Sequence, residues 1–258
     1  MKKSFMTEAI NLKNYPLNDN DSIVVMFSKQ RGLIRAVAKG AKRPKSKLGA
    51  RIQMFIANKL MLFEGKNLDT ISEAQSLNTF SKIRYDLDKL SYSMYIAEIV
   101  NLFCSKDYNK DENSAEIYEL LFKVYDLIAL CKTKTELLLL TLRFQLKLMD
   151  ILGWGIDFET CSVCQCSLED DVIFSAQTGE MCCVKCASKG FDNIKINNKI
   201  RLFMLEMKKA KIDSKTKYDE VIDENFANKC FLFMKKYIDN ISNKKTKIFD
   251  VLDSVSVG

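Results

Sequence analysis

The hydrophobic pattern of this chain changes near residue 80, and this change limits the possible folds more than any other feature. Before it, five short segments rich in Ile, Val, Leu, Phe and Met are separated by turn-like residues, at 5–12, 22–28, 32–38, 52–63 and 68–76. After it, apolar residues recur at helical spacing, as in Ile83, Leu87, Leu90 and Met94. The sequence therefore predicts an α+β protein in which strands come first and helices follow.

The five N-terminal segments predict a small β-barrel over residues 1–79. Gly65-Lys66-Asn67 is a candidate hairpin turn between the last two segments. Five short strands of this spacing suit an OB-fold, and an SH3-like barrel fits the spacing equally well.

The helical region is expected to form one domain over residues 80–245. Apolar spacing predicts helices over about 83–100, 114–130 and 134–152, the last of which ends at Gly153-Trp154-Gly155. Two further helices are expected over about 200–207 and 226–241. Residues 246–258 are predicted to form a loose C-terminal tail.

Two CxxC pairs interrupt the helical region within a Cys-rich stretch at residues 156–190. Two residues between cysteines let a knuckle turn present both sulfurs to one ion, and four soft ligands suit tetrahedral zinc. The chain has 0 histidines, so such a site must use cysteine alone. Four thiolates leave no position for water, so we expect one structural Zn²⁺ in a zinc knuckle, with the ligands Cys161, Cys164, Cys183 and Cys186.

Neighbouring cysteines leave other ligand sets open. Cys166 can replace Cys164, and Cys182 can replace Cys183, although either choice breaks the CxxC spacing. A degenerate site without metal is also compatible with the sequence, whereas a thioredoxin-like redox role needs a single CxxC that opens a helix. The three other cysteines fall on apolar helical stripes, where core positions are expected: Cys104, Cys131 and Cys230.

Positive charge is concentrated in the first third of the chain. Residues 1–80 hold 14 Lys/Arg and 6 Asp/Glu, whereas residues 81–258 hold 26 and 27. Residues 39–51, called the basic segment below, contain no acidic residue and six basic ones: Lys39, Lys42, Arg43, Lys45, Lys47 and Arg51. Two glycines and a proline in this segment predict a loop or a short turn of helix rather than a strand.

A basic loop between two barrel strands can follow a phosphate backbone while the barrel holds the base of the loop. We therefore predict salt-sensitive and largely sequence-independent nucleic-acid binding, with Arg31 and Arg35 extending the patch. Phe27, Phe55 and Tyr15 are candidates for stacking on bases, although each is equally suited to the core. A solvated loop without a ligand is the alternative interpretation of the segment.

No sequence motif points to covalent chemistry. The chain lacks GxxxxGK[ST], GxGxxG and GxSxG, and without histidine it cannot build a Ser-His-Asp or Cys-His device. No apolar run approaches the roughly 20 residues that a membrane-spanning helix needs. We therefore expect a cytoplasmic, non-enzymatic protein without catalytic residues, in which the cysteines are reduced.

Several stretches resemble the bacterial recombination mediator family RecO. The most specific is GLIRAVAKGAKRP at residues 32–44; others are TEAI at 7–10, DSIVVMFS at 21–28, LDTI at 68–71 and YIAE at 95–98. The four-cysteine arrangement, with Phe174, Ser175 and Gly179 between its two pairs, also resembles the family. The position after the first CxxC, often glycine in the family, is Gln165 here.

This resemblance implies an N-terminal OB-fold followed by a helical domain with a zinc knuckle. It implies binding of single- and double-stranded DNA, annealing of complementary strands, and help in loading RecA onto DNA coated by single-strand-binding protein. Implied partners are RecR and the acidic C-terminal tail of the single-strand-binding protein, and the implied location is the bacterial nucleoid. An RNA- or ribosome-associated module is the alternative, because barrel, basic loop and zinc knuckle also occur together there.

Overall fold

The computed structural model describes residues 3–104, 113–187, 193–216 and 222–249. Contacts within the chain group it into two units, Met1–Leu130 and Cys131–Gly258. The sequence predicts one helical domain over 80–245, whereas these contacts group the first two long helices with the barrel. The domain ranges 1–79 and 80–245 stay a prediction.

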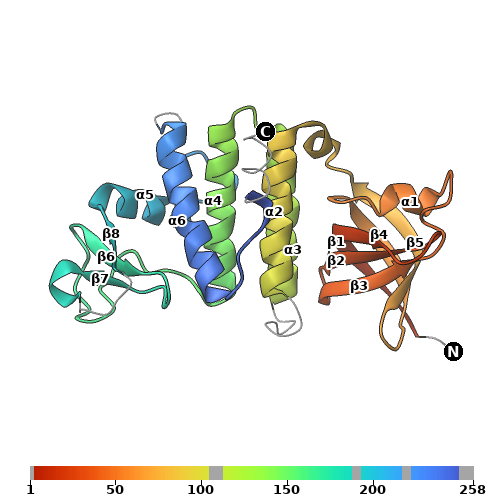
Figure 1. Ribbon diagram of the computed structural model, residues 1–258, viewed down its shortest axis with the longest axis horizontal. Coiled ribbons are helices and arrows are strands. Elements are labelled where there is room, and N and C mark those ends of the chain that lie inside the picture. The colour runs from red at the N-terminus through yellow and green to blue at the C-terminus, as the bar shows by residue number, and fades with distance from the viewer. Residues whose placement is uncertain (1–2, 105–112, 188–192, 217–221, 250–258) are drawn as a thin grey trace. The chain divides into compact units, whose positions relative to one another are not determined.

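The first unit begins with a closed five-stranded barrel (Figure 1). Its strands are β1 (Ser4–Pro16), β2 (Ser22–Ser28), β3 (Gly32–Ala38), β4 (Ala57–Phe63) and β5 (Asp69–Asn78). They follow the order β1-β2-β3-β5-β4, and β4 pairs back onto β1. β3 and β5 are parallel, whereas the other neighbours are antiparallel. This is the arrangement of an OB-fold, so it confirms the predicted barrel and decides against the SH3-like alternative.

The largest differences from the predicted strand boundaries are in β1 and β4. β1 continues past residue 12 to Pro16, which pairs with Ser22 of β2. β4 begins at Ala57 rather than at residue 52, because Phe55 has a φ of 64° in the left-handed region and interrupts the extended chain. The predicted hairpin turn after β4 is confirmed by the antiparallel pairing of β4 with β5.

The basic segment contains a short helix, α1 (Lys47–Arg51), as one of the two sequence alternatives predicts. The Ser46 hydroxyl caps it by accepting a hydrogen bond from the Gly49 N–H at 3.1 Å. Ala41 and Ile52 belong to the buried core cluster of the barrel. A β-carbon at Gly49 would collide with the carbonyl oxygen of Ala41, so glycine is what allows α1 to lie this close.

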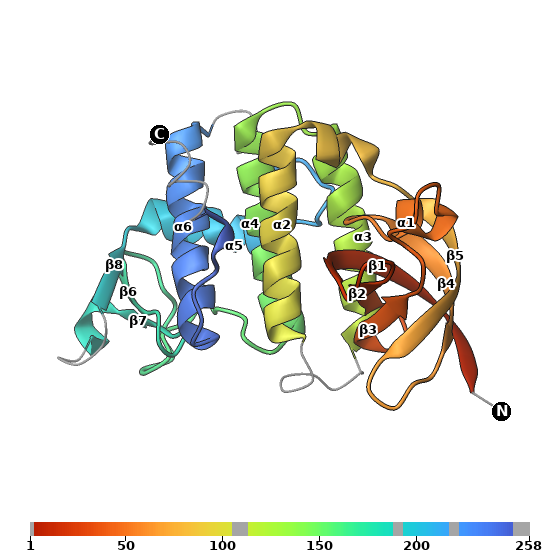
Figure 2. The ribbon, with the colours of Figure 1, turned by 45° about the vertical axis from the view of Figure 1, so that its right-hand side comes forward.

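A 3-10 helix and two α-helices complete the first unit (Figure 2). The 3-10 helix η1 (Ser81–Tyr85) leads into α2 (Leu87–Phe103), and α3 (Ser114–Leu130) contacts β1, β2 and β3. Tyr125 of α3 packs edge-on against Phe55, with 5.3 Å between ring centroids. Lys29 pairs with Glu119 of α3 at 2.6 Å. The barrel and α3 therefore share both apolar and ionic contacts.

The second unit is built from α4 (Lys134–Ile151), α5 (Asn198–Lys209) and α6 (Glu224–Ile241), and α4 contacts both of the others. Thr133 and Glu136 form a capping box that starts α4. Between α4 and α5 lies a small sheet of order β7-β6-β8, made of β6 (Val172–Ser175), β7 (Met181–Cys183) and β8 (Asn193–Ile196). The 3-10 helix η3 (Val184–Cys186) follows β7. No helix in the described parts of the chain is long and apolar enough to cross a membrane.

Phe174 of β6 packs this small sheet against α6. Its ring centroid lies 4.7 Å from that of Phe233 and 5.7 Å from that of Tyr237. The Tyr237 hydroxyl donates to the carbonyl of Trp154 at 2.8 Å. The cysteine-rich insert therefore packs onto the helices of its unit.

The chain after α6 is held against that helix at Thr246. Both the N–H and the hydroxyl of Thr246 donate to Asp239 at 2.9 Å, and Thr246 is buried. The predicted tail over 246–258 therefore starts with an anchored residue, and its residues 250–258 lie outside the described residues.

Candidate nucleic-acid interface and four-cysteine site

The β1–β2 turn holds the basic segment in place. The Gly40 N–H donates to the Asp21 carboxylate at 2.7 Å, and the Lys42 N–H donates to the carbonyl of Asn20 at 2.9 Å. The Lys42 ammonium donates to the carbonyl of Asn18 at 3.0 Å. All eight basic side chains that the sequence proposes are exposed: Arg31, Arg35, Lys39, Lys42, Arg43, Lys45, Lys47 and Arg51.

Asp21 is ionised, and its carboxylate holds the basic segment through the hydrogen bond from Gly40. The Gly40 N–H contributes most to lowering the pKa of its carboxyl, followed by the Asn18 amide and the charges of Lys39 and Arg43. An ionised Asp21 keeps the Gly40 hydrogen bond at neutral pH and draws Lys39 and Arg43 toward one place.

The loop between β3 and α1 bends at two residues in the left-handed region. Gly40 has a φ of 66° and Lys45 a φ of 61°. Farther along, the Arg51 guanidinium donates to the carbonyl of Ala74 in β5. The basic segment therefore runs from the β1–β2 turn to β5.

The two predicted flanking arginines lie elsewhere on the barrel. Arg31 precedes β3 and Lys39 follows it, so the seven residues of this strand separate them by roughly 20 Å. The Arg31 guanidinium pairs with Glu64 at 3.0 Å and lies 3.5 Å from the ring centroid of Phe5. Arg35 lies in the middle of β3, opposite Val25. The structure thus places the basic segment in the loop and helix that follow β3 and leaves Arg31 at the other end of that strand.

The aromatic residues proposed for stacking are largely core residues. Phe27 and Phe55 are each 0% exposed, so the proposal that they stack on bases is wrong and the core alternative holds. Tyr15 is half-buried, and the Lys13 ammonium lies 5.7 Å from its ring centroid. Hydrophobic patterning could not separate these roles, because an aromatic residue in a strand suits either face.

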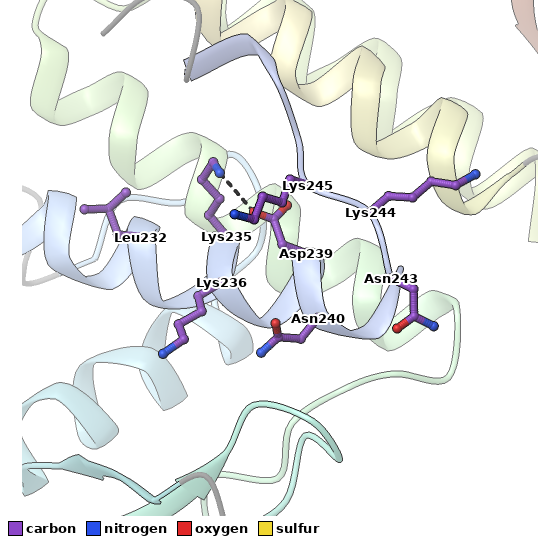
Figure 3. A pocket seen from close by; sticks show the side chains of 8 residues that line it. All are labelled: Leu232, Lys235, Lys236, Asp239, Asn240, Asn243, Lys244 and Lys245. Carbon is purple, nitrogen blue, oxygen red and sulfur yellow. Dashed lines mark hydrogen bonds and ion pairs between the residues drawn. The ribbon is translucent and has the colours of Figure 1, made fainter.

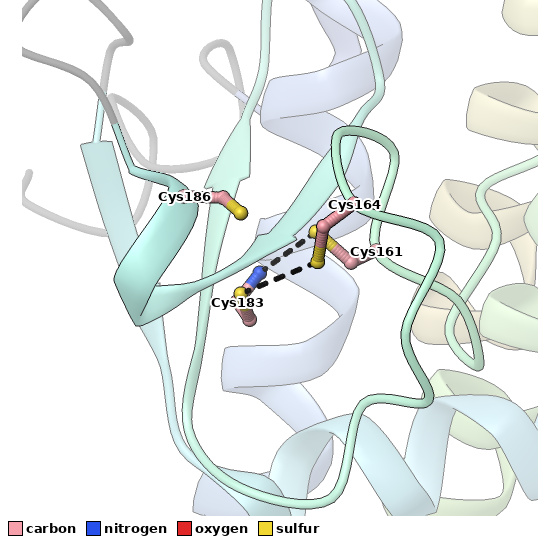
Figure 4. Close-up of side chains that lie close together, drawn as sticks. All are labelled: Cys161, Cys164, Cys183 and Cys186. Atoms are coloured by element: carbon pink, nitrogen blue, oxygen red, sulfur yellow. Dashed lines mark hydrogen bonds between the residues drawn. The ribbon is translucent and has the colours of Figure 1, made fainter.

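The four cysteines of the CxxC pairs converge in the second unit (Figure 4). Their Sγ atoms all lie within 4.8 Å of one another, in residues Cys161, Cys164, Cys183 and Cys186. The Sγ atoms of Cys164 and Cys183 are 3.9 Å apart. Zinc–sulfur bonds of about 2.3 Å in a tetrahedron place sulfurs about 3.8 Å apart. These four thiols can therefore hold one metal ion.

The backbone prepares Cys161 for metal binding. A tight turn forms where the Cys161 N–H donates to the Cys166 carbonyl at 2.9 Å and the Gln165 N–H donates to the Cys161 carbonyl at 3.0 Å. Burial alone would raise the pKa of the Cys161 thiol, but N–H groups of Cys164, Cys183 and Val163 bring the pKa down to about 6. Near neutral pH the sulfur is therefore mostly thiolate, which is the form that a metal binds.

The two neighbouring cysteines occupy different positions. Cys182 is 1% exposed and precedes Cys183 in β7, where successive side chains point to opposite faces. Cys166 is exposed, and its Sγ lies 3.3 Å from that of Cys164. Cys104 and Cys230 are buried, as expected for core residues, and Cys131 is half-buried.

Gln165 carries backbone strain in this turn, with a φ of 60°. Replacing Gln165 with glycine should raise the free energy of unfolding by about 0.5–1 kcal/mol, because glycine adopts this conformation without the β-carbon penalty. Denaturant unfolding of the metal-loaded protein measures this gain. Gln165→Ala is the matched control, since alanine keeps the β-carbon; a gain for alanine as large as that for glycine would contradict the explanation.

A basic pocket of about 560 Å³ lies at the end of α6 (Figure 3). It is lined by Leu232, Lys235, Lys236, Asp239, Asn240, Asn243, Lys244 and Lys245. Asp239 accepts from the Lys235 ammonium at 3.0 Å and from Thr246, so its charge is engaged. The sequence did not indicate this pocket, because residues 81–258 are close to neutral overall and only the turn after α6 brings Lys244 and Lys245 beside the helix.

Two family models match most of this chain. The model described as "Recombination protein O N terminal" matches residues 1–80, and "Recombination protein O C terminal" matches residues 84–214. The chain belongs to the RecO family. This agrees with the sequence resemblance at residues 32–44 and at the cysteine pairs.

Curated RecO relatives match over much of their length. "DNA repair protein RecO" of Desulforamulus reducens is 28% identical over 97% of this chain and 94% of its own. The protein of the same name from Thermoanaerobacter sp. (strain X514) is 34% identical over 72% of each chain, and that from Alkaliphilus metalliredigens is 31% identical over 74% and 75%. RecO membership gives the chain a role in DNA repair and recombination.

Proposed function

We propose that this chain is a non-enzymatic DNA-binding protein that anneals complementary strands. The observation that carries the proposal is the exposed basic segment on an OB-fold barrel, anchored by Asp21 and the β1–β2 turn. OB-folds bind single strands through a positive groove that follows the backbone. The chemistry of the segment supports phosphate binding, because it contains six cations and no acidic residue.

Annealing then needs charge neutralisation and no covalent intermediate. Two complementary strands repel each other through their phosphates, and each lysine or arginine that pairs with a phosphate releases a condensed counterion. The proposed phosphate contacts come from the basic segment, with Arg35 and Arg31 assisting: Lys39, Lys42, Arg43, Lys45, Lys47 and Arg51. Contacts of this kind are reversible, so a strand can slide until it finds its complement.

We further propose that the four-cysteine site binds one structural Zn²⁺. The all-thiolate donor set and the 3.9 Å sulfur separation support zinc. With all four tetrahedral positions taken by protein sulfur, the ion would tie the turn at Cys161 and Cys164 to the end of β7 and would not activate water.

Family membership supports a place for this activity in recombination. The chain would load RecA onto DNA that is coated by single-strand-binding protein, together with RecR, and would contact the acidic C-terminal tail of the single-strand-binding protein. Because the proposed ligand is DNA, the proposed location is the cytoplasm, at the nucleoid.

Annealing of complementary oligonucleotides coated with single-strand-binding protein tests the proposal. We expect the full chain to accelerate duplex formation strongly over the protein-free rate, measured by loss of donor fluorescence in a labelled pair. A rate equal to the protein-free rate contradicts annealing. Competition between DNA and RNA strands of equal length is the second arm, and a clear preference for RNA would favour an RNA-associated module instead. Cleavage of DNA with magnesium or manganese, or ATP hydrolysis, would contradict the non-enzymatic assignment.

A further inference from the structure

The outer faces of the barrel strands differ in accessibility. In β2, Val24 and Met26 face the core cluster of the barrel, so Val25 and Phe27 point to the outer side. These two outward residues are nevertheless 2% and 0% exposed, and α3 contacts β2. OB-folds commonly bind ligands on the face of strands 2 and 3, and here the outer side of β2 is covered.

The outer side of β4 and β5 is exposed and hollowed. A groove of about 510 Å³ lies beside α1. Figure 2 shows α1 next to β5, which it contacts. Its described lining comes from β1, α1, β4 and β5: Met6, Lys47, Leu48, Arg51, Lys59, Leu60, Met61, Ser72, Glu73, Ala74 and Gln75. Its volume falls within the roughly 300–1,000 Å³ of small-molecule sites, so there is room for a nucleotide.

The groove has a basic rim. Lys47 and Arg51 line it from α1, and Lys59 lines it from β4. Among the described lining residues, Glu73 is the acidic one, so the rim carries three positive charges and one negative charge. Lys47 and Arg51 also belong to the basic segment, so the groove continues the proposed phosphate-binding surface.

The groove also has an apolar floor. Met6 and Met61 are directly opposite each other on β1 and β4, and Met6 is 55% exposed. Phe63 does not line the groove, but it lies two residues beyond Met61 on the same side of β4 and is 36% exposed. A thioether is polarisable and packs favourably on aromatic rings. An apolar floor beneath a cationic rim suits a ligand with flat rings and phosphates.

We propose that this groove binds nucleotides of a DNA single strand, with phosphates on Lys47, Arg51 and Lys59 and bases on Met6 and Met61. The inference rests on the proposed function and extends it, because it gives the strand a path over β4 and β5 instead of β2. A duplex keeps its bases stacked and paired, so it reaches the rim and not the floor. The groove is therefore specific for single strands, whereas the loop from Lys39 to Lys45 binds both forms.

The test replaces the two methionines of the groove floor and leaves the net charge of the chain unchanged. The double variant Met6→Ser/Met61→Ser of the full chain should bind labelled oligothymidine about 3- to 10-fold more weakly by fluorescence anisotropy, because the thioether–ring contacts are lost. Its affinity for a duplex of equal length should stay unchanged. The salt dependence of single-strand binding should keep its slope, because no phosphate contact is lost.

Leu77→Ser is the matched control, because Leu77 is an exposed residue of β5, 45% accessible, that does not line the groove. It should change neither affinity. Photocrosslinking of 4-thiothymidine strands to the wild-type chain is the direct readout, and adducts are expected in β4 rather than β2. Unchanged oligothymidine affinity of the double variant, an equal loss for single strand and duplex, or adducts confined to β2 would overturn the inference.

A separate variant distinguishes this inference from the proposed function. Replacement of Lys42, Arg43 and Lys45 leaves the floor intact and should weaken single-strand and duplex binding together. If that loop variant binds both normally, the proposed phosphate surface is wrong. If the loop variant loses both and the methionine variant loses neither, the groove alone is wrong.

Discussion

Replacing Lys42, Arg43 and Lys45 together with alanine should weaken binding to single-stranded DNA by about 100-fold at 0.1 M salt. Each phosphate contact contributes ~0.7 to the slope of log affinity against log salt for a single strand. The loss of three contacts lowers that slope by ~2. Over the tenfold range from about 1 M down to about 0.1 M salt, the wild-type chain therefore gains ~100-fold more affinity than the variant does. The three side chains are exposed, so the barrel core is untouched. Titrations at several salt concentrations measure affinity and slope together.

A matched triple variant tests whether position matters as much as charge. Lys13, Lys66 and Lys82 are exposed lysines of the same unit outside the basic segment, and their joint replacement with alanine removes the same charge. We expect that variant to lose less than about 3-fold in affinity, through the long-range field alone. Equal losses in the two triple variants would show that net charge, rather than this loop, determines binding.

Arg31→Ala provides a finer comparison within the proposed set. Its guanidinium already pairs with Glu64 and covers Phe5, at the opposite end of β3 from the loop. We therefore expect Arg31→Ala to lower affinity by less than Lys42→Ala does in the same titration.

Replacing Cys161 with serine should remove the metal and destabilise the second unit by at least about 3 kcal/mol. Metal binding free energy is folding free energy for a site whose ligands converge only in the folded chain. Cys161 is 0% exposed, and its sulfur also accepts the N–H of Cys183 at 3.4 Å. Elemental analysis should give about one zinc per wild-type chain and much less for the variant, and thermal unfolding should show the loss of stability.

Cys166→Ser is the control for this experiment, because Cys166 is exposed and lies beside the four-thiol group without belonging to it. It should keep its zinc and its unfolding temperature in reducing buffer, whereas Cys186→Ser should resemble Cys161→Ser. A wild-type chain purified without zinc, or equal destabilisation by Cys166→Ser and Cys161→Ser, would refute the structural site. A chelator should lower the stability of the wild-type chain and leave the Cys161→Ser chain unchanged.

Features that depend on neighbouring residues were predictable from the sequence. Apolar composition and flanking turn residues predicted β2 and β3 with their observed bounds, and helical spacing predicted the helix over 114–130. The spacing of the CxxC pairs predicted which four sulfurs converge. Each of these signals lies within a short stretch of the sequence, so these predictions need no knowledge of distant contacts.

Features that depend on distant contacts were not predictable in the same way. The left-handed φ of Phe55 shortened the strand predicted over 52–63, although the local composition there suits a strand. The closeness of Lys244 and Lys245 to Lys235 depends on a turn after α6. The net charge of residues 81–258 is close to zero, so the charge count did not indicate this group of lysines. Such features follow from packing rather than from propensity.

The sequence by itself determined that a small β-barrel precedes the long helices, that the basic segment lies between two barrel strands, and that four cysteines can form one site. Only the tertiary structure decided which barrel surface is open. Phe27 is buried on the covered β2 side of the barrel, whereas Met6 and Met61 stay accessible because β1 and β4 border a groove beside α1. The physical reason is that periodicity assigns a side chain to one of two faces, but elements from elsewhere in the chain determine which face meets water.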